Sequence, residues 1–272
     1  MMELDRRARD IQLVVTDLDG TLLDADKQIN DRAKQAIVRL MEAGIAFTFI
    51  TGRPRPSIQR FSESVQVTAP IISCNGAVIY HNDRILLSRD FSPLRLRPLL
   101  ERAVSMGMTV LCCEGDREFA FSRTAWTDAR LHFAIRRPED FDWNTLRLVK
   151  ANIINLGEPE PFLALADQIQ EMESEFSITT YGTAGAEIIA KDVDKATGLK
   201  WLCGYLGLDV RQAMACGDNE NDNSMLREAG IGIAVANACQ STQKHADYVS
   251  SAQRTDGVTE AIEALLESRI CR

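Results

Sequence analysis

The sequence predicts an α/β protein whose core is a parallel β-sheet. Apolar runs at 13–15, 45–50 and 70–73 have the length of short buried strands. A segment with helical periodicity, 30–44, lies between the first two runs. Strands and helices that alternate at such spacings are typical of parallel sheets, because a crossover helix joins successive parallel strands. The 272 residues are enough for one or two domains.

The segment 30–44 has the signals of a complete amphipathic helix. Asn30 is a candidate N-cap, because its side chain can accept a bond from a free backbone amide. Gly44 is a candidate stop, because glycine adopts the positive φ that often ends a helix. Apolar side chains recur at helical spacing at Ala33, Ala36, Ile37, Leu40 and Met41.

A different pattern between 82 and 185 predicts an α+β module inserted into the first domain. Gly115-Asp116 separates two strand-like runs, which is a hairpin signal. The expected elements are helices at 92–106, 125–135 and 161–175, and strands at 109–112, 118–121, 149–156 and 176–181.

The pattern of the parallel sheet returns with the apolar run at 187–190. We therefore assign 1–82 and 186–272 to a core domain and 83–185 to the insertion. The expected elements that follow are helices at 199–206 and 258–266, and strands at 212–216, 230–234 and 248–249.

Composition limits the class of protein. A net charge of −8 without clustered Lys and Arg argues against nucleic acid as a partner. The sequence has no apolar run of about eighteen residues or more, no basic surface patch and no secretory leader, so we expect no membrane partner. Seven cysteines without C-x-x-C spacing predict reduced thiols and a cytoplasmic location. We expect a monomer or a weak homo-oligomer.

Two aspartates directly follow the first predicted strand. Asp17 and Asp19 have the spacing of alternate strand residues, which share one side, and Gly20 permits a tight turn. Carboxylates at the end of a buried strand are costly unless a partner neutralises them. Mg²⁺ is such a partner, since it binds one or two carboxylates together with phosphate oxygens. The alternative is an acidic turn with both side chains in water.

A second acidic cluster follows a later predicted strand. The sequence G-D-x-x-N-D at 217–222 comes directly after the apolar run 212–216. Asp218 and Asp222 bracket an amide and supply hard oxygens of the kind that Mg²⁺ prefers. Alone, such a cluster of Asp, Asn and Gly is usually a turn. Together with the first aspartates and an intervening lysine, it predicts a metal site.

Polar residues also follow the second and third predicted strands. Thr51-Gly52 offers a hydroxyl and backbone amides for phosphate oxygens, although Thr at this place is also a frequent helix cap. Lys195 offers an ammonium that can offset negative charge, although most lysines are solvated. Because ligands gather beyond the carboxyl ends of parallel strands, we expect Asp17, Thr51 and Asn75 to converge.

Five short motifs occur in a fixed order along the chain. They are D-x-D-G-T at 17–21, T-G-R at 51–53, N-G-A at 75–77, D-K at 194–195 and G-D-x-x-N-D at 217–222. This set resembles the haloacid dehalogenase-like (HAD) superfamily, and within it the Cof-type sugar-phosphate phosphatases of subfamily IIB. The resemblance covers nearly the whole chain. It implies a Rossmann-like, HAD-like core and an inserted α+β cap of the C2B type, placed where 83–185 falls.

The resemblance implies a role for each matching residue. Asp17 would be the nucleophile that carries a phosphoryl group, and Asp19 the general acid/base. Asp17, Asp218 and the backbone carbonyl of Asp19 would bind Mg²⁺. The other matches would support the metal through its waters (Asn221, Asp222), bind the phosphoryl group (Thr51, Gly52, Lys195) or contact the substrate (Arg53, Asn75, Gly76).

The implied activity is Mg²⁺-dependent hydrolysis of small phosphorylated metabolites, with sugar phosphates as the expected class. The chain departs from the family in two places: Ala196 stands where the motif lysine is often followed by Gly, and V-A-N at 235–237 stands for the frequent M-G-N. Two alternative functions remain. One is a phosphosugar mutase that returns the group from the same aspartate to a sugar, and the other is a non-catalytic sensor of phosphorylated ligands.

Overall fold

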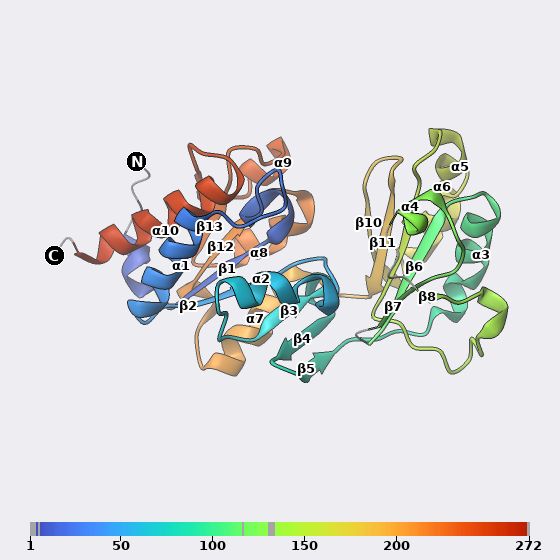
Figure 1. Cartoon of the computed structure of the whole chain (residues 1–272), viewed down its shortest axis with the longest axis horizontal. Helices are drawn as coiled ribbons and strands as arrows, with labels where there is room; N and C mark the ends of the chain where they lie inside the picture. Colours follow the sequence, from blue (N-terminus) through green and yellow to red (C-terminus); the bar gives the residue numbers. More distant parts are fainter. Residues whose placement is uncertain (1–3, 5, 116, 130–133, 271–272) are drawn as a thin grey trace. The chain divides into compact units, whose positions relative to one another are not determined.

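The chain divides into two compact units, each with its own sheet and hydrophobic core. One unit is Met1–Leu86 with Asp194–Arg272, and the other is Leu87–Val193 (Figure 1). The computed structural model describes residues 4, 6–115, 117–129 and 134–270. Asp116 of the predicted hairpin turn and 130–133 of the predicted helix at 125–135 lie outside the described residues.

The first unit is built on a five-stranded parallel sheet, as the sequence predicted. Its strands are β1 (Leu13–Thr16), β2 (Ala46–Phe49), β12 (Ala213–Gly217), β13 (Ile231–Ala234) and β14 (Tyr248–Val249). Their order is β14-β13-β12-β1-β2, and every pairing is parallel. Thr16 at the end of β1 lies opposite Cys216 of β12 and Phe49 of β2. These three strands therefore end at the same edge of the sheet.

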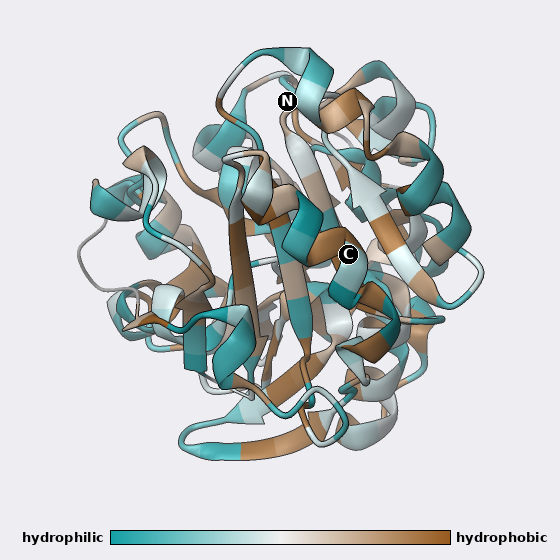
Figure 2. Cartoon of the chain, turned by 90° about the vertical axis from the view of Figure 1, so that its right-hand side faces the viewer, coloured by the Kyte–Doolittle hydropathy of each residue, from teal (hydrophilic) through white to brown (hydrophobic). Residues whose placement is uncertain are grey.

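Helices α1 (Asp31–Glu42) and α10 (Arg254–Ile270) pack against each other and share one hydrophobic core with β1, β2, β12 and β13. The Asn30 side chain accepts a hydrogen bond from the Ala33 amide at 2.8 Å, and Gly44 has φ 78°, so both predicted helix signals are confirmed. In Figure 2 brown segments alternate with white and teal ones along the strands, and the helices carry teal stretches beside brown ones. The other helices of this unit are α2 (Gln59–Ser64), α7 (Lys195–Leu206), α8 (Asn223–Glu228) and α9 (Gln240–Gln243).

A small sheet of β3 (Ile71–Ser73), β4 (Val78–His81) and β5 (Arg84–Ser88) continues the first unit beyond β2. Ile50, just after β2, forms a parallel bridge with Ile72, and the Thr51 amide donates to the Ile72 carbonyl at 3.0 Å. The third predicted strand thus touches the parallel sheet at one bridge, and its main partner is the antiparallel β4.

The second unit contains a six-stranded sheet with helices packed on its hydrophobic core. The strands are β6 (Thr109–Glu114), β7 (Arg117–Ala120), β8 (Ala134–Ile135), β9 (Lys150–Ile154), β10 (Phe176–Thr180) and β11 (Gly185–Ala190). Their order is β10-β11-β9-β6-β7-β8, with antiparallel pairings except for β7 with β8. The helices are α3 (Arg97–Ser105), α4 (Ala125–Asp128), α5 (Pro159–Leu163) and α6 (Ala166–Met172).

The strand expected in the parallel sheet at 187–190 belongs to the second unit, so that expectation is wrong. It is part of β11, which pairs with β9 and β10, and Ile188 packs in the core of the second unit. The physical reason is that a short apolar run has the same pattern whichever sheet buries it. The chain re-enters the first unit at Asp194, directly before α7.

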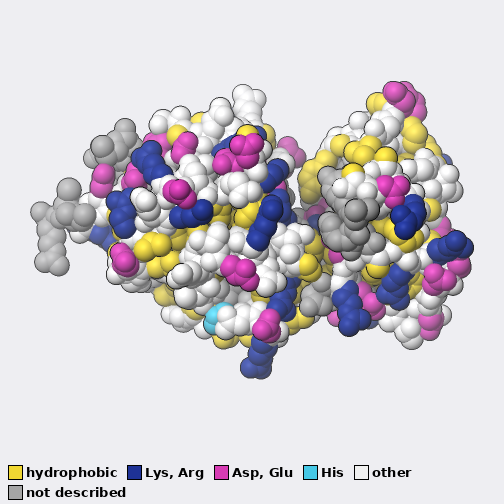
Figure 3. Space-filling view, viewed as in Figure 1, with side chains coloured by type: hydrophobic (Ala, Val, Ile, Leu, Met, Phe, Trp, Pro, Cys, Tyr) yellow, Lys and Arg dark blue, Asp and Glu magenta, His cyan; other side chains and the backbone are white. Residues whose placement is uncertain are grey.

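The surface carries charges of both signs. Lys and Arg side chains are interspersed with Asp and Glu side chains over the face shown in Figure 3. Such mixing differs from the basic stripe that nucleic-acid binding requires. Within the described part of the chain, no helix is both long enough and apolar enough to cross a membrane.

Replacing Phe47 by Ala tests the core of the first unit. The Phe47 side chain is fully buried, and its ring meets the Phe49 ring edge-on at 5.7 Å. The cavity left by Phe47→Ala should lower the free energy of unfolding by about 3–5 kcal/mol. Val38→Ala, on the exposed side of α1, should change it by about 0.5 kcal/mol or less. Urea unfolding followed by circular dichroism measures both, and equal effects would contradict the assigned core.

Candidate functional site

The site is built where three strands of the parallel sheet end. Asp17 follows β1, and its backbone amide donates to the Cys216 carbonyl of β12 at 3.0 Å. On the other side of β1, the Ile50 amide donates to the Thr16 carbonyl at 3.0 Å. These backbone bonds fix Asp17 between the ends of β12 and β2. The predicted convergence of strand ends is therefore present for Asp17 and Thr51.

Lys195 is buried between two carboxylates. Its Nζ lies 2.7 Å from Oδ1 of Asp17 and 2.6 Å from Oδ1 of Asp222. Lys195 is the first residue of α7, and Asp194 caps that helix by accepting from the Thr197 amide. Burial disfavours the charged lysine, but the two carboxylates outweigh this and raise the pKa of Lys195. The ammonium is held charged inside the protein.

Asp222 organises the second acidic loop. Its Oδ2 accepts hydrogen bonds from the amides of Asp218 at 2.8 Å and Asn219 at 3.0 Å, while its Oδ1 accepts from Lys195. A Cβ on Gly217 would lie 2.5 Å from the Asp222 Cβ, so only glycine permits this close approach. Both oxygens of Asp222 are thus engaged by the protein itself.

Asp218 faces the first acidic motif. Its Oδ1 accepts a hydrogen bond from the Thr21 hydroxyl at 2.8 Å. Burial raises the pKa of Asp218 to about 6, and the Thr21 hydrogen bond opposes part of that rise. No role for Thr21 was predicted from the sequence. The one feature of the sequence that could have indicated this contact is that Thr21 is the last residue of the D-x-D-G-T motif.

Three carboxylates come together around the lysine. One oxygen from each of Asp17, Asp218 and Asp222 can be chosen so that all lie within 4.8 Å of one another. Burial raises the pKa of Asp17, and the neighbouring carboxylates add to this, although Lys195 lowers it. Three acidic groups and one ammonium leave excess negative charge. An all-oxygen set of this kind fits a hard divalent cation.

Asp19 lies in a different environment from Asp17. Arg53 donates to both of its carboxylate oxygens, from Nε at 2.5 Å and from Nη2 at 2.8 Å, and Lys27 donates from Nζ at 2.9 Å. Burial alone would raise the pKa of Asp19, but the hydrogen bonds from Arg53 and Lys27 lower it to about 2. Arg53 was predicted only as a substrate contact, and no role was predicted for Lys27.

The T-G-R loop packs on the N-G-A loop. The Asn75 amide donates to the Thr51 carbonyl at 2.9 Å, and the Cys74 amide donates to the Arg53 carbonyl at 3.2 Å. Cys74 and Asn75 have φ 49° and 52°, a strained backbone conformation for residues other than glycine. A Cβ on Gly52 would lie 3.2 Å from the Asn75 side chain.

The same loop also reaches the second acidic loop. The Asn221 side-chain amide donates to Oδ1 of the buried Asn75 at 3.2 Å. Gly76 lies beneath α7, because a Cβ on Gly198 would come 3.2 Å from the Gly76 Cα. Asn75 and Gly76 therefore hold the loops together in this structure, and their predicted contact with substrate stays a prediction.

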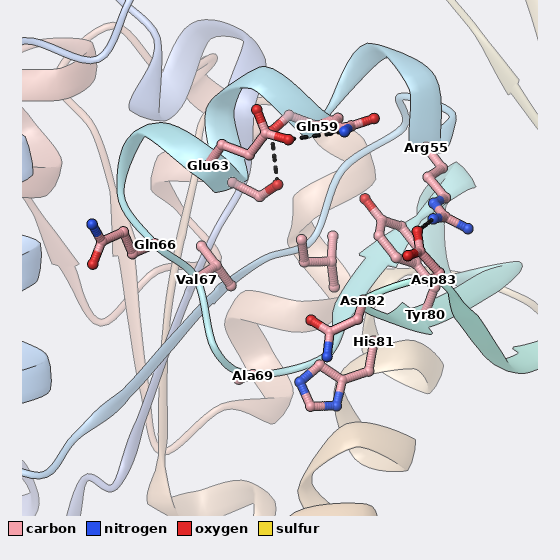
Figure 4. A pocket seen from close by; sticks show the side chains of 12 residues that line it. Arg55, Gln59, Glu63, Gln66, Val67, Ala69, Tyr80, His81, Asn82 and Asp83 are labelled. Atoms are coloured by element: carbon pink, nitrogen blue, oxygen red, sulfur yellow. Dashed lines mark hydrogen bonds and ion pairs between the residues drawn. The ribbon is translucent and has the colours of Figure 1, made fainter.

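A separate cavity of about 430 Å³ lies between α2 and the turn that joins β4 to β5 (Figure 4). Its lining mixes charged and polar side chains with apolar ones such as Val67 and Ile71. None of the residues predicted for the site lines this cavity. It is distinct from the carboxylate cluster at the strand ends.

Comparisons with known proteins agree with the fold and the motifs. A model of the haloacid dehalogenase-like hydrolase family matches residues 14–262. The 5-amino-6-(5-phospho-D-ribitylamino)uracil phosphatase YcsE of Bacillus subtilis is 26% identical over 96% of this chain and 98% of its own. A phosphoglycolate phosphatase of Methanobrevibacter smithii is 27% identical over 93% of this chain and 97% of its own.

A solved structure gives the same result. A haloacid dehalogenase-like hydrolase from Bacteroides thetaiotaomicron superposes with a TM-score of 0.79 at 27% identity, covering 93% of this chain and 98% of that one. The family match spans far more than half of the sequence and includes all five motifs. As its Cof-type motifs predicted, this chain belongs to the haloacid dehalogenase-like hydrolase family.

Proposed function

We propose that this protein is a cytoplasmic, Mg²⁺-dependent phosphatase that hydrolyses small phosphorylated metabolites, in particular sugar phosphates. The observation that carries the proposal is the buried Lys195 ammonium between Asp17 and Asp222, with Asp218 beside them. Such a cluster of opposite charges can bind a metal ion and a phosphoryl group side by side. Two relatives named as phosphatases of small phosphorylated metabolites support the substrate class.

The metal would be held by Asp17, Asp218 and the backbone carbonyl of Asp19. Asn221 and Asp222 would contact the metal through its water molecules. Both oxygens of Asp222 already accept hydrogen bonds from the protein, which favours a water-mediated contact over direct ligation. When bound, the cation neutralises phosphoryl oxygens that would otherwise repel an anionic nucleophile. An all-oxygen donor set supports Mg²⁺ over softer metals.

The phosphoryl group would be bound by Lys195, the Thr51 hydroxyl and the Gly52 amide. A carboxylate oxygen of Asp17 then attacks phosphorus, and the bond from phosphorus to the ester oxygen breaks with its electron pair on that oxygen. Asp19 donates a proton to the departing oxygen. In the second half, Asp19 takes a proton from water, which attacks the aspartyl phosphate and releases phosphate from Asp17.

Substrate selection is assigned to the inserted segment 83–185, as the cap of the family resemblance. One observation supports separate parts for catalysis and substrate selection: Leu87–Val193 forms a compact unit with its own hydrophobic core. Arg53, Asn75 and Gly76 remain the proposed substrate contacts of the first unit.

Asp17→Asn tests the nucleophile. The amide keeps the size of the side chain but cannot attack phosphorus, so phosphate release from p-nitrophenyl phosphate should fall by roughly a thousandfold or more. The exposed Asp31→Asn is the control and should keep full activity, since Asp31 pairs only weakly with Lys34 at the surface. Full activity of Asp17→Asn would refute the assignment.

A screen of phosphorylated metabolites defines the substrate class and separates the alternative activities. We expect phosphate release from sugar phosphates, measured with a colorimetric phosphate assay. A mutase would instead give an isomerised sugar phosphate without free phosphate. A sensor would bind a phosphorylated metabolite in calorimetry without turnover, and either result would replace the phosphatase assignment.

Mg²⁺ should raise the melting temperature more at about pH 7.5 than at about pH 5. The pKa of Asp218 is raised from 3.8 to about 6, so the folded metal-free protein binds this proton more tightly than the unfolded chain. The stability that this proton contributes is therefore lost as pH rises from 3.8 to about 6. Above that pH the proton no longer competes with Mg²⁺ for the Asp218 carboxylate. Differential scanning fluorimetry measures the shift, and equal shifts at both pH values would contradict it.

Gly20→Ala should abolish metal binding, whereas Gly44→Ala should not. Both glycines have positive φ, 83° and 78°, so both substitutions strain the backbone to a similar extent. At Gly20 the new Cβ would collide with the Asp218 carboxylate, whereas at Gly44 no atom of the described residues lies within 4 Å of it. Isothermal titration with Mg²⁺ compares the two variants. Similar affinities of the two variants for Mg²⁺ would show that metal binding does not require the close contact between Gly20 and the Asp218 carboxylate.

A further inference from the structure

The loop that follows β13 contacts both acidic loops of the site. It begins with V-A-N at 235–237, a motif to which the proposed reaction assigns no role. The Asn237 side chain donates from Nδ2 to the Gly20 carbonyl at 2.8 Å. Two residues further on, the Cys239 amide donates to the Asp218 carbonyl at 2.9 Å. This one loop therefore joins the turn of the first acidic motif to the second acidic motif.

Asn237 is itself held by the start of α10. Its Oδ1 accepts a hydrogen bond at 2.8 Å from the backbone amide of Arg254, which is the first residue of that helix. The helix in turn packs against Leu18–Leu22, the segment that contains Gly20. Because amides at a helix start carry partial positive charge, the bond from Arg254 polarises the Asn237 side chain and strengthens its donation to Gly20.

The turn at Gly20 packs directly on Asp218. Gly20 has φ 83°, and a Cβ at this position would collide with the Asp218 carboxylate. The next residue, Thr21, donates from its hydroxyl to Oδ1 of Asp218 at 2.8 Å. The carbonyl that Asn237 holds belongs to the peptide between Gly20 and Thr21. Its orientation therefore determines where the Thr21 hydroxyl lies, and with it one oxygen of Asp218.

We propose that Asn237 is a positioning residue for Asp218, an inference that rests on the proposed binding of Mg²⁺. By holding the Gly20 carbonyl, Asn237 keeps the Thr21 hydroxyl on Asp218 and so orients that carboxylate toward Asp17. Mg²⁺ demands near-ideal octahedral geometry, so a small displacement of one ligand lowers its affinity. Groups that orient metal ligands typically change metal affinity by roughly ten- to a hundredfold when they are removed.

Asn155 of the second unit provides a matched control. Its Nδ2 donates to the carbonyls of Glu158 at 2.9 Å and Thr183 at 3.1 Å, and its Oδ1 accepts from the Gly157 amide at 3.3 Å. Like Asn237, it therefore ties backbone groups of separate segments together through both ends of its amide. Asn155 belongs to none of the motifs proposed to bind metal. Its removal reports what such an amide contributes to structure alone.

Asn237→Ala should weaken Mg²⁺ binding roughly tenfold in isothermal titration, whereas Asn155→Ala should keep the wild-type affinity within about twofold. Both variants lose hydrogen bonds to the backbone, so both should lower the melting temperature of the metal-free protein in scanning fluorimetry. Asn237→Ser can replace one of the two bonds, so it should lose less affinity, and it serves as the second variant where Asn237→Ala does not fold. Wild-type affinity in the Asn237 variants, or an equal loss in Asn155→Ala, would overturn the proposal.

A double-mutant cycle with Thr21→Val tests the route from Asn237 to Asp218. Valine keeps the shape of the threonine side chain but cannot donate to Asp218. If Asn237 acts through Thr21, the double variant should lose less Mg²⁺ affinity than the product of the two separate losses. Losses that multiply would contradict this route. A wild-type protein that binds no Mg²⁺ would instead refute the proposed metal site itself.

Discussion

The buried ammonium of Lys195 is the interaction on which the site depends. It has no exposed surface and lies within hydrogen-bonding distance of Asp17 and Asp222. Removing any member of such a group leaves an uncompensated buried charge, which is far more costly than the loss of one surface ion pair. Asp218 adds a third carboxylate that the lysine alone cannot balance. The excess negative charge is the physical reason to expect a cation here.

The sheet makes this arrangement possible. Asp17 follows β1 and Asp218 follows β12, and β1 lies between β12 and β2, so the loops after all three strands meet at one edge. Lys195 reaches Asp17 from the first residue of α7. Backbone pairing fixes the register of these strands, and the side chains inherit their spacing from it. The loops then stabilise one another, since Asn75 accepts from Asn221 and its amide donates to Thr51.

Much of the site was predictable because parallel sheets gather ligands at one edge. Polar residues after apolar runs therefore identified Asp17, Thr51 and Asp218. Lys27 was not predictable, since its contact with Asp19 depends on a left-handed backbone that no motif records. The strand at 187–190 was assigned to the wrong sheet for a related reason. Hydrophobicity indicates that a segment is buried, but pairing partners are set by the rest of the chain.

The D-x-D motif places two chemically identical side chains in opposite environments. Burial raises the pKa of Asp17 and the neighbouring carboxylates add to this, so a bound cation would favour its ionised form. Asp19 is half-exposed and held by Arg53 and Lys27, which lower its pKa to about 2. In the proposed roles Asp17 is ionised and Asp19 carries a proton, so a bound metal and substrate would have to reverse both of these pKa directions. The turn at Gly20, with φ 83°, directs the chain away directly after Asp19, so the two carboxylates lie in different environments although only Leu18 separates them.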